Sequence, residues 1–247
     1  MKEKSKLLIT SFILMFMIIL SIGIGNYLGG IGNYFFYHIV FCIIISVCIP
    51  IYYFRKEDNG DLSHLGIKKL RIIDYIIIIG FVAFSIGGSL KGTNIKNINF
   101  GLLPLCIAPF IMSTICEEFF FRGFLQIRFE KAFGAIPAVI ISGFAFGLYH
   151  LGYPCLRNFG LITTLIFVGI MFALSFKLSK NNLIVSYFVN LPNAYMQYLL
   201  YPEHFPYENF TLPATIISIV IICIIGFILK KGLVKEKLKL INAQIEV

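Results

Sequence analysis

The stretch "ICEEFFFRGF" (115–124) places two adjacent glutamates and an arginine inside an apolar run. A charged side chain at the centre of a membrane-spanning helix costs about 2.5–3.5 kcal/mol on insertion scales. Such residues usually face a protein interior or a wet cavity, where they serve a function. The sequence on either side decides whether this run lies in a membrane.

The flanking sequence has the composition of a membrane protein. The 247 residues are 58% hydrophobic and only 13% charged, with a mean hydropathy of +0.88, whereas a soluble domain carries about a quarter charged residues. Helices satisfy their own backbone polar groups in lipid. We therefore predict an all-α, polytopic membrane helix bundle and a single integral membrane domain over 1–247. About eight runs are long enough to cross a hydrocarbon layer of ~30 Å: 7–29, 34–54, 73–90, 101–127, 135–151, 159–178, 182–200 and 211–229.

The basic residues predict how this bundle is oriented. If both termini are cytoplasmic, 17 of the 21 lysines and arginines fall in inner segments and three in outer segments, with Arg122 inside a span. This predicts a multi-pass protein of the cell membrane whose first helix is retained. The residues 230–247 are then a basic cytoplasmic tail on anionic lipid. The same distribution explains the net charge of +9 by topology, so the lipid bilayer is a predicted partner and nucleic acid is not.

Helical spacing divides the three charges of the opening stretch. Glu118 and Arg122 are four residues apart on one face, with the acid first, which is the favourable order for a pair. Glu117 is rotated by about 100° from Glu118. We therefore predict that Arg122 neutralises Glu118, while Glu117 points elsewhere without a local partner and is available for proton transfer.

The fifth predicted span ends in "SGFAFGLYH" (142–150). Gly143 and Gly147 form a small-xxx-small pair that predicts close contact with another helix. Phe146 lies four residues before His150 and is expected to help fix its ring. A lone histidine at the end of a span is more often an interfacial residue, but a nearby pair of intramembrane glutamates favours a functional one.

The seventh predicted span carries Asn190 and Asn193 on either side of Pro192. Proline loosens the helix backbone. Two interpretations stay open: the amides hydrogen-bond neighbouring helices of a kinked bundle, or Asn190 donates a hydrogen bond to an oxyanion.

A glutamate, a histidine and an amide on three helices are the groups that peptide hydrolysis needs. The glutamate and histidine can hold and deprotonate a water, and the amide can stabilise the tetrahedral intermediate. A divalent metal on Glu117, Glu118 and His150 is conceivable, but the chain has no HExxH motif and adjacent carboxylates on a helix diverge. No cofactor is therefore predicted.

Two of these segments carry the signatures of a known family. "EEFFFRG" (117–123) matches EExxxR, and "FGLYH" (146–150) matches FxxxH. Their order and spacing on successive spans resemble the CAAX protease and bacteriocin-processing family, also called ABI or CPBP, which includes the type II CAAX prenyl endopeptidases. The resemblance covers about 100–200, so the predicted protease core lies in helices four to seven.

The resemblance implies an intramembrane glutamate endopeptidase with a cavity that opens toward the cytoplasm. Glu117 would activate water, His150 would position it, and Glu118 with Arg122 would be the supporting pair. The third family motif is a histidine followed four residues later by asparagine. This chain has Asn190 at the histidine position and Ala194 at the asparagine position.

The depths of the two motifs predict one further feature. Glu117 lies near the middle of the fourth span and His150 late in the fifth. We expect the fourth helix to end soon after Arg122, with "FLQIRFEKAFG" (124–134) along the inner interface.

The leading prediction is an endopeptidase that cleaves a membrane-associated peptide or protein. The Ile-, Lys- and Asn-rich composition suggests a bacterium, where processing of a bacteriocin or pheromone, or immunity, is more plausible than prenylated substrates. The alternative is a catalytically impaired family member that acts as a non-enzymatic immunity or scaffold protein, motivated by Asn190 and Ala194. A proton-coupled transporter lacks support because intramembrane ionisable groups are few and no inverted repeat is visible.

Overall fold

The computed structural model describes residues 2–57, 66–90 and 103–200, together with short helical pieces between 216 and 227. Over these residues the chain is helical without any strand, which confirms the predicted all-α class. The predicted span 211–229 lies largely, and the predicted tail 230–247 wholly, outside the described residues. The helices are α1 (Lys2–Leu28), α2 (Gly30–Asn33), η1 (Tyr34–Cys48), α3 (Ile49–Glu57), α4 (Ile72–Leu90), α5 (Leu103–Glu118), η5 (Phe119–Gln126), α6 (Ile127–Phe133), α7 (Ala135–Tyr149), η6 (His150–Gly152), η7 (Pro154–Leu156), α8 (Phe159–Leu178) and α9 (Leu183–Leu200).

Several of these helices can span a membrane, so the protein is a multi-pass membrane protein. In the described part of the chain, five helical segments are long and apolar enough: Lys4–Leu28, Gly30–Phe54, Ile72–Leu90, Ala135–Gly152 and Phe159–Leu178. They correspond to the first, second, third, fifth and sixth predicted spans. The fourth and seventh predicted spans are helical as well, but the count of about eight membrane-spanning helices is not confirmed.

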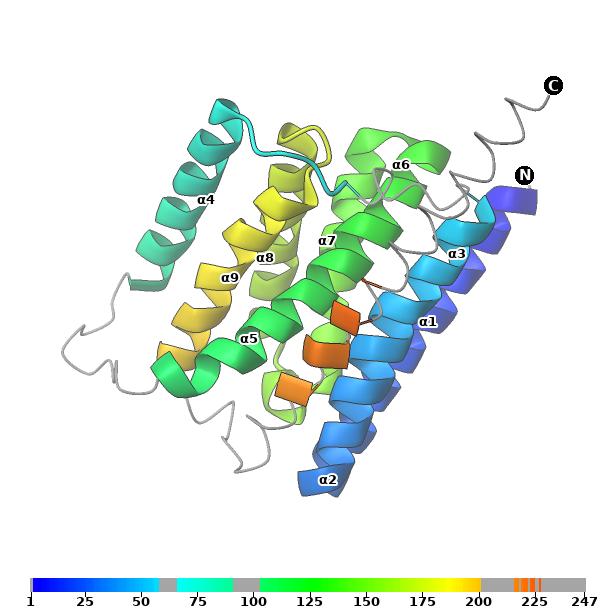
Figure 1. Cartoon of the computed structure of the whole chain (residues 1–247), viewed down its shortest axis with the longest axis vertical. Coiled ribbons are helices and arrows are strands. Elements are labelled where there is room, and N and C mark those ends of the chain that lie inside the picture. The colour runs from blue at the N-terminus through cyan, green and yellow to red at the C-terminus, as the bar shows by residue number, and fades with distance from the viewer. Residues whose placement is uncertain are drawn as a thin grey trace.

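The helices lie side by side, with α4 at one edge of the bundle and α1 with α3 at the other (Figure 1). Inside the bundle, α7 and α8 cross at two glycines. A Cβ atom on Gly143 would lie 2.7 Å from the backbone nitrogen of Ile170, and one on Gly147 would lie 2.7 Å from that of Ile166. The predicted close contact at this glycine pair is confirmed, because only glycine lets the two backbones approach so far.

The helix that carries the glutamates continues well past Arg122. It widens into the π-helix η5, returns to α-helical geometry in α6, and ends at Gly134, whose φ of 89° is readily reached by glycine. The predicted end of this helix soon after Arg122 is therefore wrong. The physical reason is that polar side chains beyond Glu118 find partners on α8, so the segment has no need to move to the interface.

We call the continuous helix of α5, η5 and α6 the glutamate helix. Its contacts with α8 form a polar ladder of three rungs. Each rung joins residues 47 positions apart, and successive rungs are four residues apart on both helices. A constant offset means that the two helices run in the same direction. The rungs are Arg122 Nη2 to the Gly169 carbonyl at 2.8 Å, Gln126 Nε2 to the Ala173 carbonyl at 2.9 Å, and Lys177 Nζ to Glu130 Oε1.

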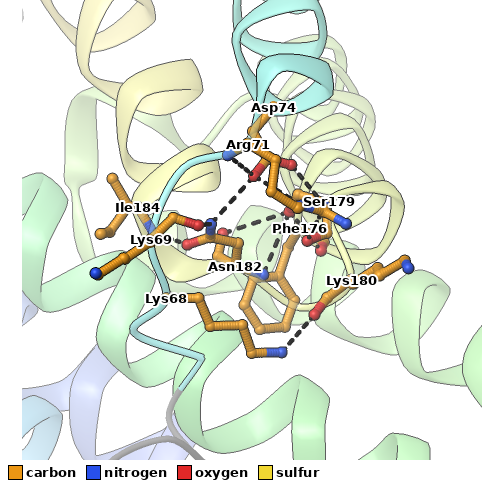
Figure 2. A network of polar contacts seen from close by, with 9 residues as sticks. All are labelled: Lys68, Lys69, Arg71, Asp74, Phe176, Ser179, Lys180, Asn182 and Ile184. Carbon is orange, nitrogen blue, oxygen red and sulfur yellow. Dashed lines mark hydrogen bonds and ion pairs between the residues drawn. The ribbon is translucent and has the colours of Figure 1, made fainter.

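A second polar cluster ties the start of α4 to the turn between α8 and α9 (Figure 2). We call Arg71, Asp74, Ser179 and Asn182 the polar clamp. The buried Asp74 carboxylate accepts hydrogen bonds from the Arg71 backbone at 2.8 Å, from its Nη2 at 2.6 Å and from Asn182 Nδ2 at 3.5 Å. Arg71 Nη2 also donates to the Ser179 carbonyl at 2.9 Å. The hydrogen bond with Asp74 raises the pKa of the Arg71 guanidinium, so Arg71 stays protonated.

Replacing Asp74 with asparagine is expected to loosen this end of the bundle. Hydrogen bonds to a charged group contribute about 1.5–3 kcal/mol, and the amide keeps only part of them. We expect a lower midpoint of thermal unfolding for the detergent-solubilised protein. Lys69→Ala is the matched control, because the exposed Lys69 side chain points away from the clamp in Figure 2. Equal unfolding midpoints for Asp74→Asn and the wild type would show that the clamp contributes nothing.

Candidate active site

Glu117 lies in the last turn of α5 and is surrounded by hydrogen-bond donors. Its Oε1 accepts from the Tyr149 hydroxyl at 2.5 Å and from Ser113 Oγ at 3.2 Å, and its Oε2 accepts from Asn190 Nδ2 at 2.9 Å. The side chain is 7% exposed. The prediction that Glu117 has no local partner is wrong. Ser113 is one turn away on the same helix, and Tyr149 and Asn190 come from α7 and α9.

Asn190 joins the two adjacent glutamates. Its Nδ2 also donates to Glu118 Oε1 at 2.9 Å, so one amide group bridges both carboxylates. The other oxygens of the pair face different partners: Glu117 Oε1 faces Tyr149, and Glu118 Oε2 faces Arg122. A side-chain amide has two N–H donors, and both are engaged here. Of the two interpretations left open, this arrangement favours an amide that bonds a neighbouring helix.

Glu118 and Arg122 form the predicted pair. Arg122 Nε lies 3.4 Å from Glu118 Oε2, and the arginine is fully buried. The rings of Phe121, Phe146 and Phe172 surround the guanidinium, at 5.9, 4.8 and 5.5 Å from its carbon to the ring centroids. The charge of Arg122 is thus balanced by one carboxylate, one carbonyl of the polar ladder and aromatic faces, which are favourable surroundings for a buried cation.

His150 directly follows α7, and its tautomer can be derived. Its Nδ1 lies 2.9 Å from the carbonyl oxygen of Phe146, which can only accept, so Nδ1 carries a hydrogen and, in the neutral ring, Nε2 is the nitrogen that can accept. The Phe146 ring lies 5.2 Å from the imidazole centroid, which confirms the predicted contact. The imidazole also lies against the Tyr149 ring, at 4.0 Å between centroids. Since Tyr149 bonds Glu117, the end of α7 reaches the depth of Glu117, and the difference in depth inferred from the sequence does not exist.

Asn193 is separated from this group. Its Oδ1 accepts a hydrogen bond from Ser85 Oγ of α4 at 2.7 Å. Asn190 and Asn193 therefore bond different helices, although their spacing of three residues predicts one shared face. Ser85 was not predicted from the sequence, because a serine within an apolar run is common and gives no signal of its partner.

Tyr149 is a site residue that the motifs did not predict. It sits between Phe146 and His150 of the FxxxH signature and is 1% exposed. A tyrosine hydroxyl that is buried usually finds a hydrogen-bond partner. A tyrosine next to the motif histidine in an apolar span was therefore a usable signal that some polar group lay opposite.

The carboxylates of Glu117 and Glu118 are the groups at which a cation could bind. In the ranges that the structure describes, no group of three or more His, Cys, Asp or Glu side chains is placed to hold a metal ion.

Comparison with known proteins identifies the segment that carries this site. Residues 99–191 match the family model described as type II CAAX prenyl endopeptidase Rce1-like. The match includes EExxxR, FxxxH and Asn190, and it confirms the resemblance to the CAAX protease family. Searches of curated proteins and of solved structures found no significant match.

Proposed function

We propose that this CAAX-protease-like chain is an intramembrane endopeptidase that hydrolyses a peptide bond of a membrane-associated peptide or protein. One observation carries the proposal: Glu117 is buried in a helical bundle and accepts hydrogen bonds from Tyr149 of α7 and Asn190 of α9. His150, which can accept a hydrogen bond at Nε2, directly follows Tyr149 in the chain. Buried ionisable groups in a membrane protein usually mark such a site.

In the proposed reaction, Glu117 and His150 Nε2 hold one water. The water oxygen attacks the carbonyl carbon of the substrate while its proton passes to Glu117. When the tetrahedral intermediate collapses, Glu117 returns that proton to the amide nitrogen and the C–N bond breaks. Glu118 stays neutralised by Arg122, and the Asn190 amide reduces the repulsion between the two carboxylates.

The substrate class within this proposal follows from family analogy. For a bacterial membrane protein, a prenylated substrate is less plausible than a bacteriocin precursor or a peptide pheromone. A toxin against which the protein gives immunity is also more plausible.

Glu117→Gln is the experiment that tests the function. The glutamine keeps the size of the side chain and can still accept from Tyr149, but it cannot take a proton from water. Since general-base catalysis contributes about 10²–10⁴-fold, we expect the full-length substrate to accumulate in the membrane peptidome of Glu117→Gln cells. Glu130→Gln on α6 is the matched control and is expected to leave the peptidome unchanged. An unchanged peptidome in Glu117→Gln cells at normal protein abundance would refute the proposal.

A second candidate is a non-enzymatic immunity or scaffold protein. It is favoured by the saturated amide of Asn190, which stands where the family has a histidine. In that case a Glu117→Ala, His150→Ala double variant still protects cells or binds its partner. Loss of protection at normal expression would eliminate this candidate.

A further inference from the structure

The hydroxyl of Tyr149 is the feature from which a further role can be inferred. It donates to Glu117 Oε1 at 2.5 Å, the short end of the usual range for a hydrogen bond between a hydroxyl and a carboxylate. Tyr149 lies at the C-terminal end of α7, next to the histidine of the proposed reaction. The donor is therefore placed beside the carboxylate that would activate water.

The ring of Tyr149 is held from three sides. It stacks on Phe41 of η1 at 5.9 Å and 27°, and it packs on Phe121 of η5 at 5.1 Å and on Phe146 of α7 at 5.5 Å. The oxygen is thus fixed in space, while its hydrogen can still rotate about the C–O bond. Such a donor can change acceptors with little reorganisation, which is the property that stabilises a developing charge.

The proposed reaction needs a donor that the third family motif does not provide here. Both N–H groups of Asn190 are engaged by the glutamates, and Ala194 has no polar side chain. Ser113 also reaches Glu117 Oε1, but at 3.2 Å. A phenol is a stronger acid than an alkyl hydroxyl, so Tyr149 is the better donor of the two.

We propose that Tyr149 is a catalytic residue of this site and donates a hydrogen bond to the oxyanion of the tetrahedral intermediate. At rest the hydroxyl donates to the negative Glu117. When the water proton moves onto Glu117, the carbonyl π electrons of the substrate move onto its oxygen, so the negative charge passes from the carboxylate to the oxyanion. The Tyr149 O–H then rotates and donates its hydrogen bond to the oxyanion. Tyr149 keeps its proton throughout, and collapse of the intermediate returns the hydrogen bond to Glu117.

This proposal rests on the proposed function, and a kinetic experiment separates the two. The probe is the synthetic form of the membrane peptide that accumulates most in Glu117→Gln cells. Tyr149→Phe removes only the hydroxyl, and loss of one oxyanion donor lowers kcat by about 10²–10³-fold. We expect that fall in kcat with little change in KM. Tyr153→Phe is the control, because its ring lies in the same aromatic cluster, 6.4 Å from that of Tyr149.

The outcomes are distinct. If Glu117→Gln is inactive and Tyr149→Phe has the wild-type kcat, the role of Tyr149 is refuted and the protease survives. If Glu117→Gln cleaves normally, the proposed function itself fails. Should Tyr149→Phe fold poorly, para-aminophenylalanine at position 149 keeps the ring and a para N–H donor. Its kcat should fall between those of tyrosine and phenylalanine, and a value no higher than that of phenylalanine would overturn the donor role.

Discussion

Replacing Arg122 with leucine is expected to remove most of the folded protein from the membrane. Arg122 is fully buried, and it compensates the Glu118 carboxylate at 3.4 Å and satisfies the Gly169 carbonyl at 2.8 Å. Removing one partner of a buried ion pair costs about 3–5 kcal/mol, because the other charge stays buried without compensation. Domains are stable by only about 5–15 kcal/mol, so this loss is a large share of the total.

The measurement is membrane abundance together with thermal unfolding in detergent. Arg157→Leu is the matched control, since Arg157 is exposed and its Nε donates to the Leu151 carbonyl at the other end of the bundle. The double variant Glu118→Gln, Arg122→Leu should recover part of the abundance, because it removes both charges. Wild-type stability of Arg122→Leu alone would show that Glu118 has another source of compensation.

Replacing Gly143 with valine is expected to separate α7 from α8. The first added carbon already lies 2.7 Å from the backbone nitrogen of Ile170, and a backbone atom cannot turn aside as a flexible side chain can. Overpacking a core costs about 1–3 kcal/mol, and more where the obstacle is backbone. Because α7 carries Tyr149 and α8 carries the carbonyls of the polar ladder, the site should be lost together with stability.

Gly80→Val on α4 is the control for this prediction. Gly80 also lies within a membrane-spanning helix, but a Cβ atom there meets nothing within 4 Å. Both variants place the same side chain in an apolar helix, so only the difference in space separates them. We expect normal abundance for Gly80→Val and little folded protein for Gly143→Val. Equal stability of the two would contradict the close crossing of α7 and α8.

Features that repeat along one helix could be predicted from the sequence. The apolar runs give the helices, the four-residue spacing gives the Glu118–Arg122 pair, and the glycines four residues apart give the crossing of α7 and α8. Each of these depends on helical periodicity alone, which a sequence shows directly.

Features that depend on the register between helices could not be predicted. Whether Asn190 meets Glu117 and Asn193 meets Ser85 depends on how α9 is rotated and shifted against two other helices. The π-helical geometry of η5 could not be predicted either. A π-helical turn changes the faces on which all following residues lie. Spacing arguments that assume 3.6 residues per turn therefore lose force beyond Phe119, where η5 begins.

The polar ladder has a mechanical consequence. All three rungs share one offset, so sliding α8 by a single residue, about 1.5 Å along its axis, would break them together. We therefore expect these contacts to keep the glutamate helix and α8 in a fixed register. If the proposed protease admits a peptide to Glu117, other helices must move against this pair. Besides its packing, α4 is joined to the bundle by the polar clamp and by the hydrogen bond between Ser85 and Asn193.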